Sequence, residues 1–282
     1  MIKFENVSYT YNKGRPDETH ALSGIDLEIP DKGVTALIGH TGSGKSTLIQ
    51  LINGLLVPQS GKIFVNGTEV GAKGTDLRAL RFRVGVVFQY PEQQLFEETV
   101  RKDIAYGPKN MGLSDDEISR RTKRAADIVG LSDEELDRSP FELSGGQRRR
   151  AAIAGVLAME PEILVMDEPV SGLDPEGRRR IFDLIRRLST ERPDVSVIFV
   201  SHSMETAAEE ADNIIVMNEG RIAASGSAEE VFSDAEHLRS IGLDIPYVTE
   251  LCIRLRAAGF DIGNSYRVQD AAEGIKRAFA DA

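Results

Sequence analysis

Hydrophobic and polar residues alternate along residues 2–11 and 21–29, which is typical of antiparallel strands with one face in water. Continuous apolar runs further along the chain predict buried strands at 34–39, 162–169 and 195–202, and two further strands are predicted at 62–67 and 84–89. Segments of helical period separate these runs, at 45–56, 114–130, 144–160 and 176–191. Buried strands that alternate with helices predict an α/β fold with a largely parallel sheet, in which ligands bind beyond the carboxyl ends of the strands.

The pattern changes near residue 235. Residues 213–226 predict a hairpin that closes the α/β part, and two short helical patterns follow at 246–262 and 268–282. We therefore expect a small helical appendage at the C-terminal end.

Composition narrows the class of protein. Hydrophobic residues make up 41% of the 282 residues and charged residues 28%, which is typical of a globular protein with a sizeable core. A net charge of −11 argues against nucleic acid as the main ligand. The single cysteine, Cys252, excludes a disulfide within the chain and fits a reducing compartment. Without an apolar run of about 18 residues, we expect no transmembrane segment, so a membrane role requires a partner.

The segment "GHTGSGKST" has the spacing of a phosphate-binding loop and lies between a predicted strand and a predicted helix. Its glycines allow positive φ and bring backbone N–H groups close to phosphate oxygens. Lys45 can reach the β and γ phosphates, and the Ser46 hydroxyl can hold Mg²⁺. The sequence therefore predicts that a nucleotide and Mg²⁺ bind at Gly39, His40, Thr41, Gly42, Ser43, Gly44, Lys45, Ser46 and Thr47.

Polar residues follow three other apolar strands. Asp167 in "ILVMDEP" is a candidate Mg²⁺ partner, and Glu168 is a candidate base that orients an attacking water. His202 in "VSH" can contact the γ phosphate. Gln89 after "VGVVF" can bind Mg²⁺ or position water, or it is simply a polar residue that ends a strand.

A second anion-binding turn is predicted at "LSGGQRRR", residues 143–150. Backbone N–H groups at the start of a helix attract anions, yet this turn contains no lysine. Arginines 148–150 oppose the helix dipole by about 0.3–1 kcal/mol each. A nearby triphosphate, Glu142 or Glu160 would offset this cost; alternatively, the arginines form a solvated basic face.

The order of these motifs resembles the ATP-binding cassette (ABC) ATPases over about residues 2–235. The resemblance implies a P-loop fold with a mostly parallel core sheet, an antiparallel N-terminal β-subdomain and a helical signature subdomain at about 90–160. It also implies one nucleotide-binding domain, 1–235, and a C-terminal helical extension, 236–282, that helps two ATPases to pair. "YPEQQLFEETV" and "GHTGSGK" look most like the second ATPase subunit of energy-coupling-factor importers.

The signature turn of that family, which matches "LSGGQ" at residues 143–147, faces a γ phosphate bound by another subunit. The resemblance thus implies that Ser144, Gly145, Gly146 and Gln147 contact ATP in trans, with Asp174 near the dimer seam. Tyr11 resembles the aromatic residue that stacks on adenine; the alternatives are a strand-face aromatic or Tyr9. The segment after Gln89, "YPEQQLFEETV" at residues 90–100, resembles the surface where a membrane subunit docks.

The sequence thus predicts an ATPase on the cytoplasmic face of the membrane. Its partners would be a second ATPase, identical or homologous, and a membrane scaffold with a separate substrate-binding protein for vitamins or transition-metal ions. Lys45, Gln89, Glu168 and His202 are the catalytic candidates, and Ser46, Gln89 and Asp167 the metal ligands. The alternatives are another ABC transporter, a soluble cassette ATPase, or a partner that does not hydrolyse ATP. The sequence leaves the cargo and the choice between homodimer and heterodimer open.

Overall fold

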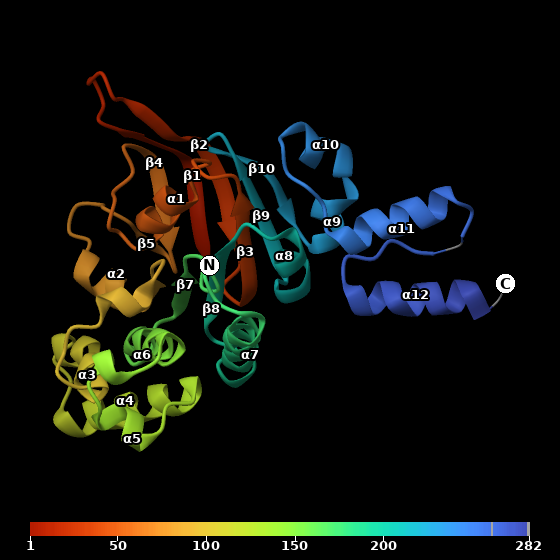
Figure 1. The fold of residues 1–282 in the computed structure, drawn as a ribbon. Helices are drawn as coiled ribbons and strands as arrows, with labels where there is room; N and C mark the ends of the chain where they lie inside the picture. Colours follow the sequence, from red (N-terminus) through yellow and green to blue (C-terminus); the bar gives the residue numbers. More distant parts are fainter. Residues whose placement is uncertain (261, 281–282) are drawn as a thin grey trace.

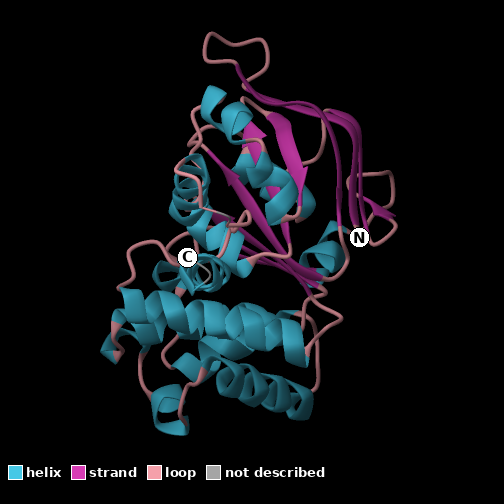
Figure 2. Cartoon of the chain, turned by 90° about the vertical axis from the view of Figure 1, so that its right-hand side faces the viewer, coloured by secondary structure: helices cyan, strands magenta, loops and turns pink. Residues whose placement is uncertain are grey.

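The computed structural model describes residues 1–260 and 262–280. Strands occupy the upper part of the molecule, and a lobe of helices lies below them (Figure 2). The last two helices extend from the side opposite this lobe (Figure 1). Residues 261, 281 and 282 of the expected C-terminal helices lie outside the described residues.

The larger sheet has six strands in the order β10-β9-β3-β8-β7-β6. Neighbours are parallel except β9 and β10, which form the expected antiparallel hairpin. The strands are β3 (Gly33–Gly39), β6 (Val84–Val87), β7 (Ile163–Met166), β8 (Ser196–Ser201), β9 (Asn213–Asn218) and β10 (Arg221–Gly226). The prediction of a largely parallel core sheet is confirmed.

A second, antiparallel sheet has the order β2-β1-β4-β5. Its strands are β1 (Ile2–Tyr11), β2 (Thr19–Ile29), β4 (Ser60–Val65) and β5 (Thr68–Glu69). Apolar side chains from β1 and β2 pack with those of the larger sheet and helix α1 (Lys45–Ile52) in one core. This is the predicted N-terminal β-subdomain.

Four helices form the lobe between β6 and β7: α3 (Val100–Asn110), α4 (Asp115–Val129), α5 (Asp133–Asp137) and α6 (Gly145–Leu157) (Figure 1). Ser114 caps α4 by accepting a hydrogen bond from the Glu117 N–H, and three acids occupy its first turn. The other helices are α2 (Leu77–Arg83), α7 (Pro175–Glu191), α8 (Met204–Glu210), α9 (Ala228–Ser233), α10 (Ala235–Ser240), α11 (Tyr247–Ala257) and α12 (Val268–Ala280).

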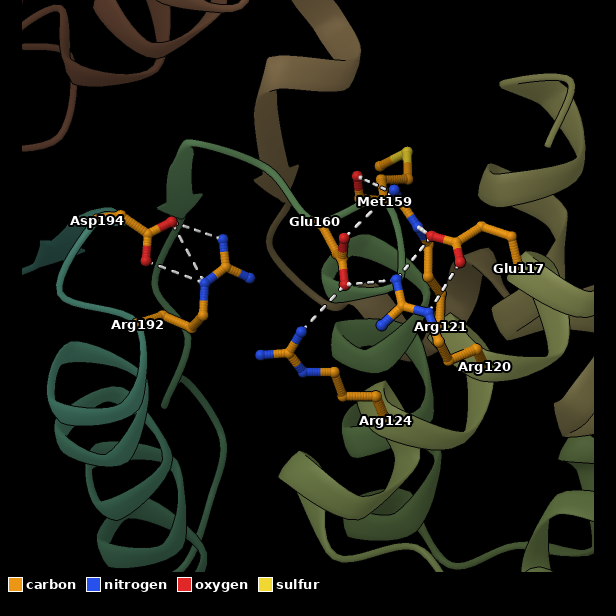
Figure 3. Close-up of polar contacts among 8 residues, drawn as sticks. All are labelled: Glu117, Arg120, Arg121, Arg124, Met159, Glu160, Arg192 and Asp194. Atoms are coloured by element: carbon orange, nitrogen blue, oxygen red, sulfur yellow. Dashed lines mark hydrogen bonds and ion pairs between the residues drawn. The ribbon is translucent and has the colours of Figure 1, made fainter.

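An ion-pair cluster around Glu160 ties α4 to the connection between α6 and β7 (Figure 3). The Glu160 carboxylate lies 3.3 Å from nitrogens of both Arg121 and Arg124. Arg121 also donates to the backbone carbonyl of Met159 at 3.2 Å. These contacts fix the lobe at the point where its chain returns to the sheet, so Glu160 is held by the arginines of α4 rather than by Arg148–Arg150.

The C-terminal part joins the main core before its last two helices begin. Leu238, Leu243 and Ile245 are buried in the same cluster as β3 and β8. Cys252 of α11 is buried as well. The division at residue 235 and the pairing role of residues 236–282 stay predictions.

Candidate functional site

The phosphate-binding loop lies between β3 and α1, as predicted. The buried Lys45 Nζ donates to the backbone carbonyls of Gly39 and His40, each at 2.7 Å. Burial lowers the pKa of Lys45, and the charges of Glu168 and Asp167 oppose this shift. The lysine thus lies inside its own loop, where incoming phosphate oxygens can replace the carbonyls as acceptors.

Two glycines of this loop are required by the fold. Gly39 has a φ of 145°, and a Cβ there would lie 2.2 Å from the carbonyl oxygen of Met217. Gly44 has a φ of 104°, and a Cβ there would lie 2.6 Å from the carbonyl oxygen of Ala21. Any side chain at either position would displace backbone, so the loop keeps its close turn only with glycine.

Three predicted catalytic side chains meet at one edge of the sheet. The Glu168 Oε2 accepts a hydrogen bond from the Gln89 amide nitrogen at 2.9 Å, and Oε1 lies 2.6 Å from His202 Nε2. These residues follow β6, β7 and β8, which are neighbours in the sheet. Glu168 itself has a φ of 47°, a strained conformation for a residue other than glycine, of the kind that clusters at active sites.

The predicted metal ligands form a donor set that suits Mg²⁺. Ser46, Gln89 and Asp167 supply hydroxyl, amide and carboxylate oxygens, which are the ligands this ion prefers. Burial raises the pKa of Asp167, and the charge of Glu168 raises it further. A divalent cation beside this carboxylate would stabilise its charged form, so the residues fit the ion.

Tyr11 lies beside the end of the phosphate-binding loop. Its hydroxyl is 3.2 Å from Thr47 Oγ1, and its ring contacts that of Tyr9 edge-on with centroids 5.0 Å apart. The structure thus places Tyr11 next to the loop, and its stacking on adenine stays a prediction.

The signature turn begins helix α6 with a capping box. Ser144 Oγ accepts from the Gln147 N–H at 3.3 Å, and Gln147 Oε1 accepts from the Ser144 N–H at 2.8 Å. The Gln147 amide also donates to Glu135 at 2.6 Å. The Ser-x-x-Gln spacing in the sequence is itself a signal for such a cap.

The two glycines of this turn have no structural need to be glycine. Neither has a positive φ, and a Cβ on either would have no heavy atom within 4 Å among the described residues outside its own helix and chain neighbours. Glycine in a helix destabilises it by roughly 0.5–1 kcal/mol relative to alanine. The packing of the chain therefore does not require glycine at either position, and both positions leave open space at the surface.

A pocket of about 550 Å³ lies between the signature turn and the start of α7. Ser144, Gly145 and Gly146 line one side, and Asp174 and Gly177 line the other. Asp174 caps α7 through a 2.7 Å bond from the Gly177 N–H. Of the described residues that line this pocket, none belongs to the loop 39–47. This pocket beside the signature turn is thus separate from the phosphate-binding loop.

Two of the arginines after the signature turn, Arg149 and Arg150, pair with acidic residues. Arg149 is buried and pairs with Glu92, so a solvated basic face is the wrong interpretation for this residue. Arg150 lies 3.8 Å from Glu135, which also holds Gln147. Neither acidic partner is evident from the sequence pattern, because Glu92 lies 57 positions from Arg149 and the contact with Glu135 depends on how α5 packs against the start of α6.

The ABC transporter family model matches residues 22–171, more than half of the chain. The chain belongs to this family. It is 52% identical to the energy-coupling factor transporter ATP-binding protein EcfA2 of Caldanaerobacter subterraneus subsp. tengcongensis, over 98% of this chain and 96% of the relative. The EcfA2 protein of Clostridioides difficile is 54% identical over 93% of this chain and 91% of its own length.

Solved structures agree with this assignment. CbiO1 of Clostridium perfringens, part of the ABC transporter complex cbiONQ, superposes with a TM-score of 0.75 at 38% identity, covering 92% of this chain and 96% of that one. A dimeric ATP-binding cassette, MJ0796 bound to ADP and Pi, superposes with a TM-score of 0.70 at 28% identity, covering 80% and 98%. The fold and the ATPase class predicted from the sequence are confirmed. None of the described helices has the length and apolar character needed to cross a membrane.

The segment after Gln89 carries exposed aromatic side chains. Phe96 of this segment is 60% exposed. Its ring contacts edge-on that of Tyr106, a 47% exposed residue of the following helix α3, with ring centroids 5.0 Å apart. The buried Asp103 carboxylate holds the segment by accepting from the N–H groups of Phe96 at 3.2 Å and Glu97 at 3.1 Å. Burial raises the pKa of Asp103.

Replacing Asp103 by alanine should loosen this segment. Two backbone N–H groups would lose their acceptor, so we expect the free energy of unfolding to fall by about 1–3 kcal/mol. Urea unfolding of the full chain measures the change. Glu209→Ala removes an exposed acid on α8 and is the control, with an expected change within about 0.5 kcal/mol. Equal stability of the two variants would contradict the holding role of Asp103.

Proposed function

We propose that this chain is the EcfA2-type subunit of an energy-coupling factor importer and that it hydrolyses ATP to energise transport. The observation that carries the proposal is the position of Gln89. Its amide donates to Glu168 on one side, and the chain continues from it into the segment that exposes Phe96. One residue therefore joins the predicted hydrolysis site to a surface suited to a membrane subunit.

The nucleotide would lie between two ATPase subunits. Two observations support this arrangement: the signature turn lines a pocket apart from the phosphate-binding loop, and its glycines leave open space. Ser144, Gly145, Gly146 and Gln147 of one subunit would contact the γ phosphate bound by the other, with Asp174 at the seam. The second ATPase is a homologous or identical chain, and residues 236–282 would help the two to pair.

Within the site, each predicted residue has a distinct task. Lys45 would bind the β and γ phosphates, with the loop N–H groups around them. Glu168 would orient and deprotonate the attacking water, a contribution of about 10²–10⁴-fold to the rate. His202 would contact the γ phosphate and keep Glu168 in place. Tyr11 would stack on adenine.

Mg²⁺ is the second cofactor that we propose. Ser46, Asp167 and Gln89 would hold it, and the bound ion would neutralise charge on the β and γ phosphates. The donation from the Gln89 amide nitrogen to Glu168 keeps the side-chain oxygen as the acceptor atom for the ion.

The membrane partner would be a scaffold subunit on the cytoplasmic face, bound at the segment after Gln89. A separate membrane protein would select the cargo, a vitamin or a transition-metal ion. Phe96 and Tyr106 together offer an aromatic patch of the kind that anchors protein interfaces.

The test is co-purification from membranes of the native host. A tagged chain should recover a hydrophobic membrane subunit and a second ATPase. Phe96→Asp should lower recovery of the membrane subunit by about 30-fold, as expected for loss of a central aromatic anchor. Binding of ATP should not change, since the phosphate-binding loop is untouched. Leu55→Asp, at another exposed apolar residue, is the control. Recovery of no membrane protein, or an equal loss with Leu55→Asp, would contradict the proposal.

A further inference from the structure

Arg149 connects three parts of the molecule: helix α6, the segment after Gln89 and the loop that follows β7. From helix α6, its guanidinium makes two bonds to the Glu92 carboxylate, at 3.0 and 3.1 Å. It also donates to the backbone carbonyls of Pro169 at 3.3 Å and Ser171 at 2.8 Å. Glu92 belongs to the 3-10 turn Pro91–Gln94, which begins two residues after Gln89.

The Arg149 guanidinium is buried, and all three of its nitrogens donate hydrogen bonds. Arg149 is 3% exposed, and a buried guanidinium is tolerated only with good partners. Burial raises the pKa of Glu92, but the hydrogen bond from Arg149, a backbone hydrogen bond and the charges of Arg149 and Arg148 together outweigh burial, so the net shift of the pKa is downward. Glu92 is therefore ionised at neutral pH, and the planar fork of Arg149 holds it in one orientation.

The acceptors of Arg149 lie on the loop that carries the candidate base. Pro169 follows Glu168 directly, and Ser171 comes three residues after it. Glu168 has a left-handed backbone conformation, which persists only when its surroundings hold it. Two connections thus run to this loop from Gln89 and the segment after it. The Gln89 amide donates to the Glu168 side chain, and Arg149, paired with Glu92, donates to the backbone carbonyls of Pro169 and Ser171.

We propose that Arg149 is a positioning residue for ATP hydrolysis. It links the signature helix and the segment after Gln89 to the backbone that follows Glu168, so that the three parts move together. The proposal rests on the assignment of Glu168 as the base. Arg149 does not contact the nucleotide in this account, and its loss displaces Glu168 without removing any group that binds ATP.

The test compares steady-state ATP hydrolysis by assembled complexes that contain wild-type chain, Arg149→Gln or Arg149→Lys. We expect both variants to lower kcat by about 10–100-fold, the effect of a displacement of about 1 Å at the reacting groups. KM for ATP should stay within about twofold, because ground-state binding is unchanged. Lysine keeps the charge but lacks the fork, so it should restore thermal stability without restoring kcat.

Two further variants separate positioning from stability. Leu157→Ala removes a buried side chain from the same helix and should lower the melting temperature while leaving kcat near the wild-type value. Glu92→Gln keeps the carbonyl contacts of Arg149 and should lower kcat less than Arg149→Gln; it also gives an answer if the arginine variants do not fold. Wild-type kcat in Arg149→Lys or in Arg149→Gln would overturn the proposal, and so would an equal loss of kcat in Leu157→Ala.

Two results distinguish a failure of this inference from a failure of the proposed function. If Glu168→Gln hydrolyses ATP at the wild-type rate, the base assignment fails and the inference fails with it. If Glu168→Gln is inactive while Arg149→Gln keeps the wild-type kcat, the ATPase site stands and only the role of Arg149 is rejected.

Discussion

Glu168→Gln should still bind ATP yet lose turnover. Glutamine has the size of glutamate and can still pair with Gln89 and His202, so the site keeps its shape. It cannot accept a proton from the attacking water. We expect kcat to fall by about 10²–10⁴-fold, the usual contribution of a positioned general base.

The measurement is phosphate release by the assembled complex, together with binding of a fluorescent ATP analogue. Glu209→Gln, at an exposed acid on α8, is the matched control and should keep the wild-type kcat. Unchanged turnover in Glu168→Gln would contradict the assignment of the base. Loss of nucleotide binding would show that Glu168 is needed for structure instead.

Gly146→Asp should keep or raise the stability of the isolated chain and lower ATP hydrolysis by the complex. The position has open space, and a carboxylate in the first turn of a helix is favourable by about 0.3–1 kcal/mol. The isolated chain should thus be at least as stable as the wild type. In the complex, the carboxylate would face the γ phosphate bound by the partner, and hydrolysis should fall by about 10²–10³-fold, as when an oxyanion donor is removed.

A glycine of the other loop provides the contrast. Gly39→Ala would place a Cβ 2.2 Å from the Met217 carbonyl, so this variant should lose both stability and activity. Thermal unfolding of the chain and ATP hydrolysis by the complex together separate the two classes of glycine. A large loss of stability in Gly146→Asp would contradict the view that this glycine serves a neighbouring subunit.

The sequence predicted those features that depend on local pattern. Apolar runs located the strands of the core sheet, and the glycine spacing located the phosphate-binding loop at the end of β3. The meeting of Gln89, Glu168 and His202 followed from their places at strand ends, because parallel strands end at the same edge.

Contacts between distant segments could not be predicted in this way. Arg149 looked like part of a basic run, and only the packing of the turn Pro91–Gln94 against α6 explains its burial. The sequence offers Glu160 as a partner for the same run, but Arg121 and Arg124 of α4 pair with it. In both cases the packing of segments more than 30 positions apart determines which charged residues pair. Composition carries no information about this packing.

The central claim is that this chain holds half of each site and that a second subunit completes it. The most direct test is a structure of the assembled Glu168→Gln complex with ATP and Mg²⁺. We predict that the γ phosphate bound at Lys45 lies about 3 Å, a hydrogen-bond distance, from the signature serine and glycine N–H groups of the other ATPase. Nucleotide contacted by one subunit alone, with the turn at Ser144 open to solvent, would contradict the account.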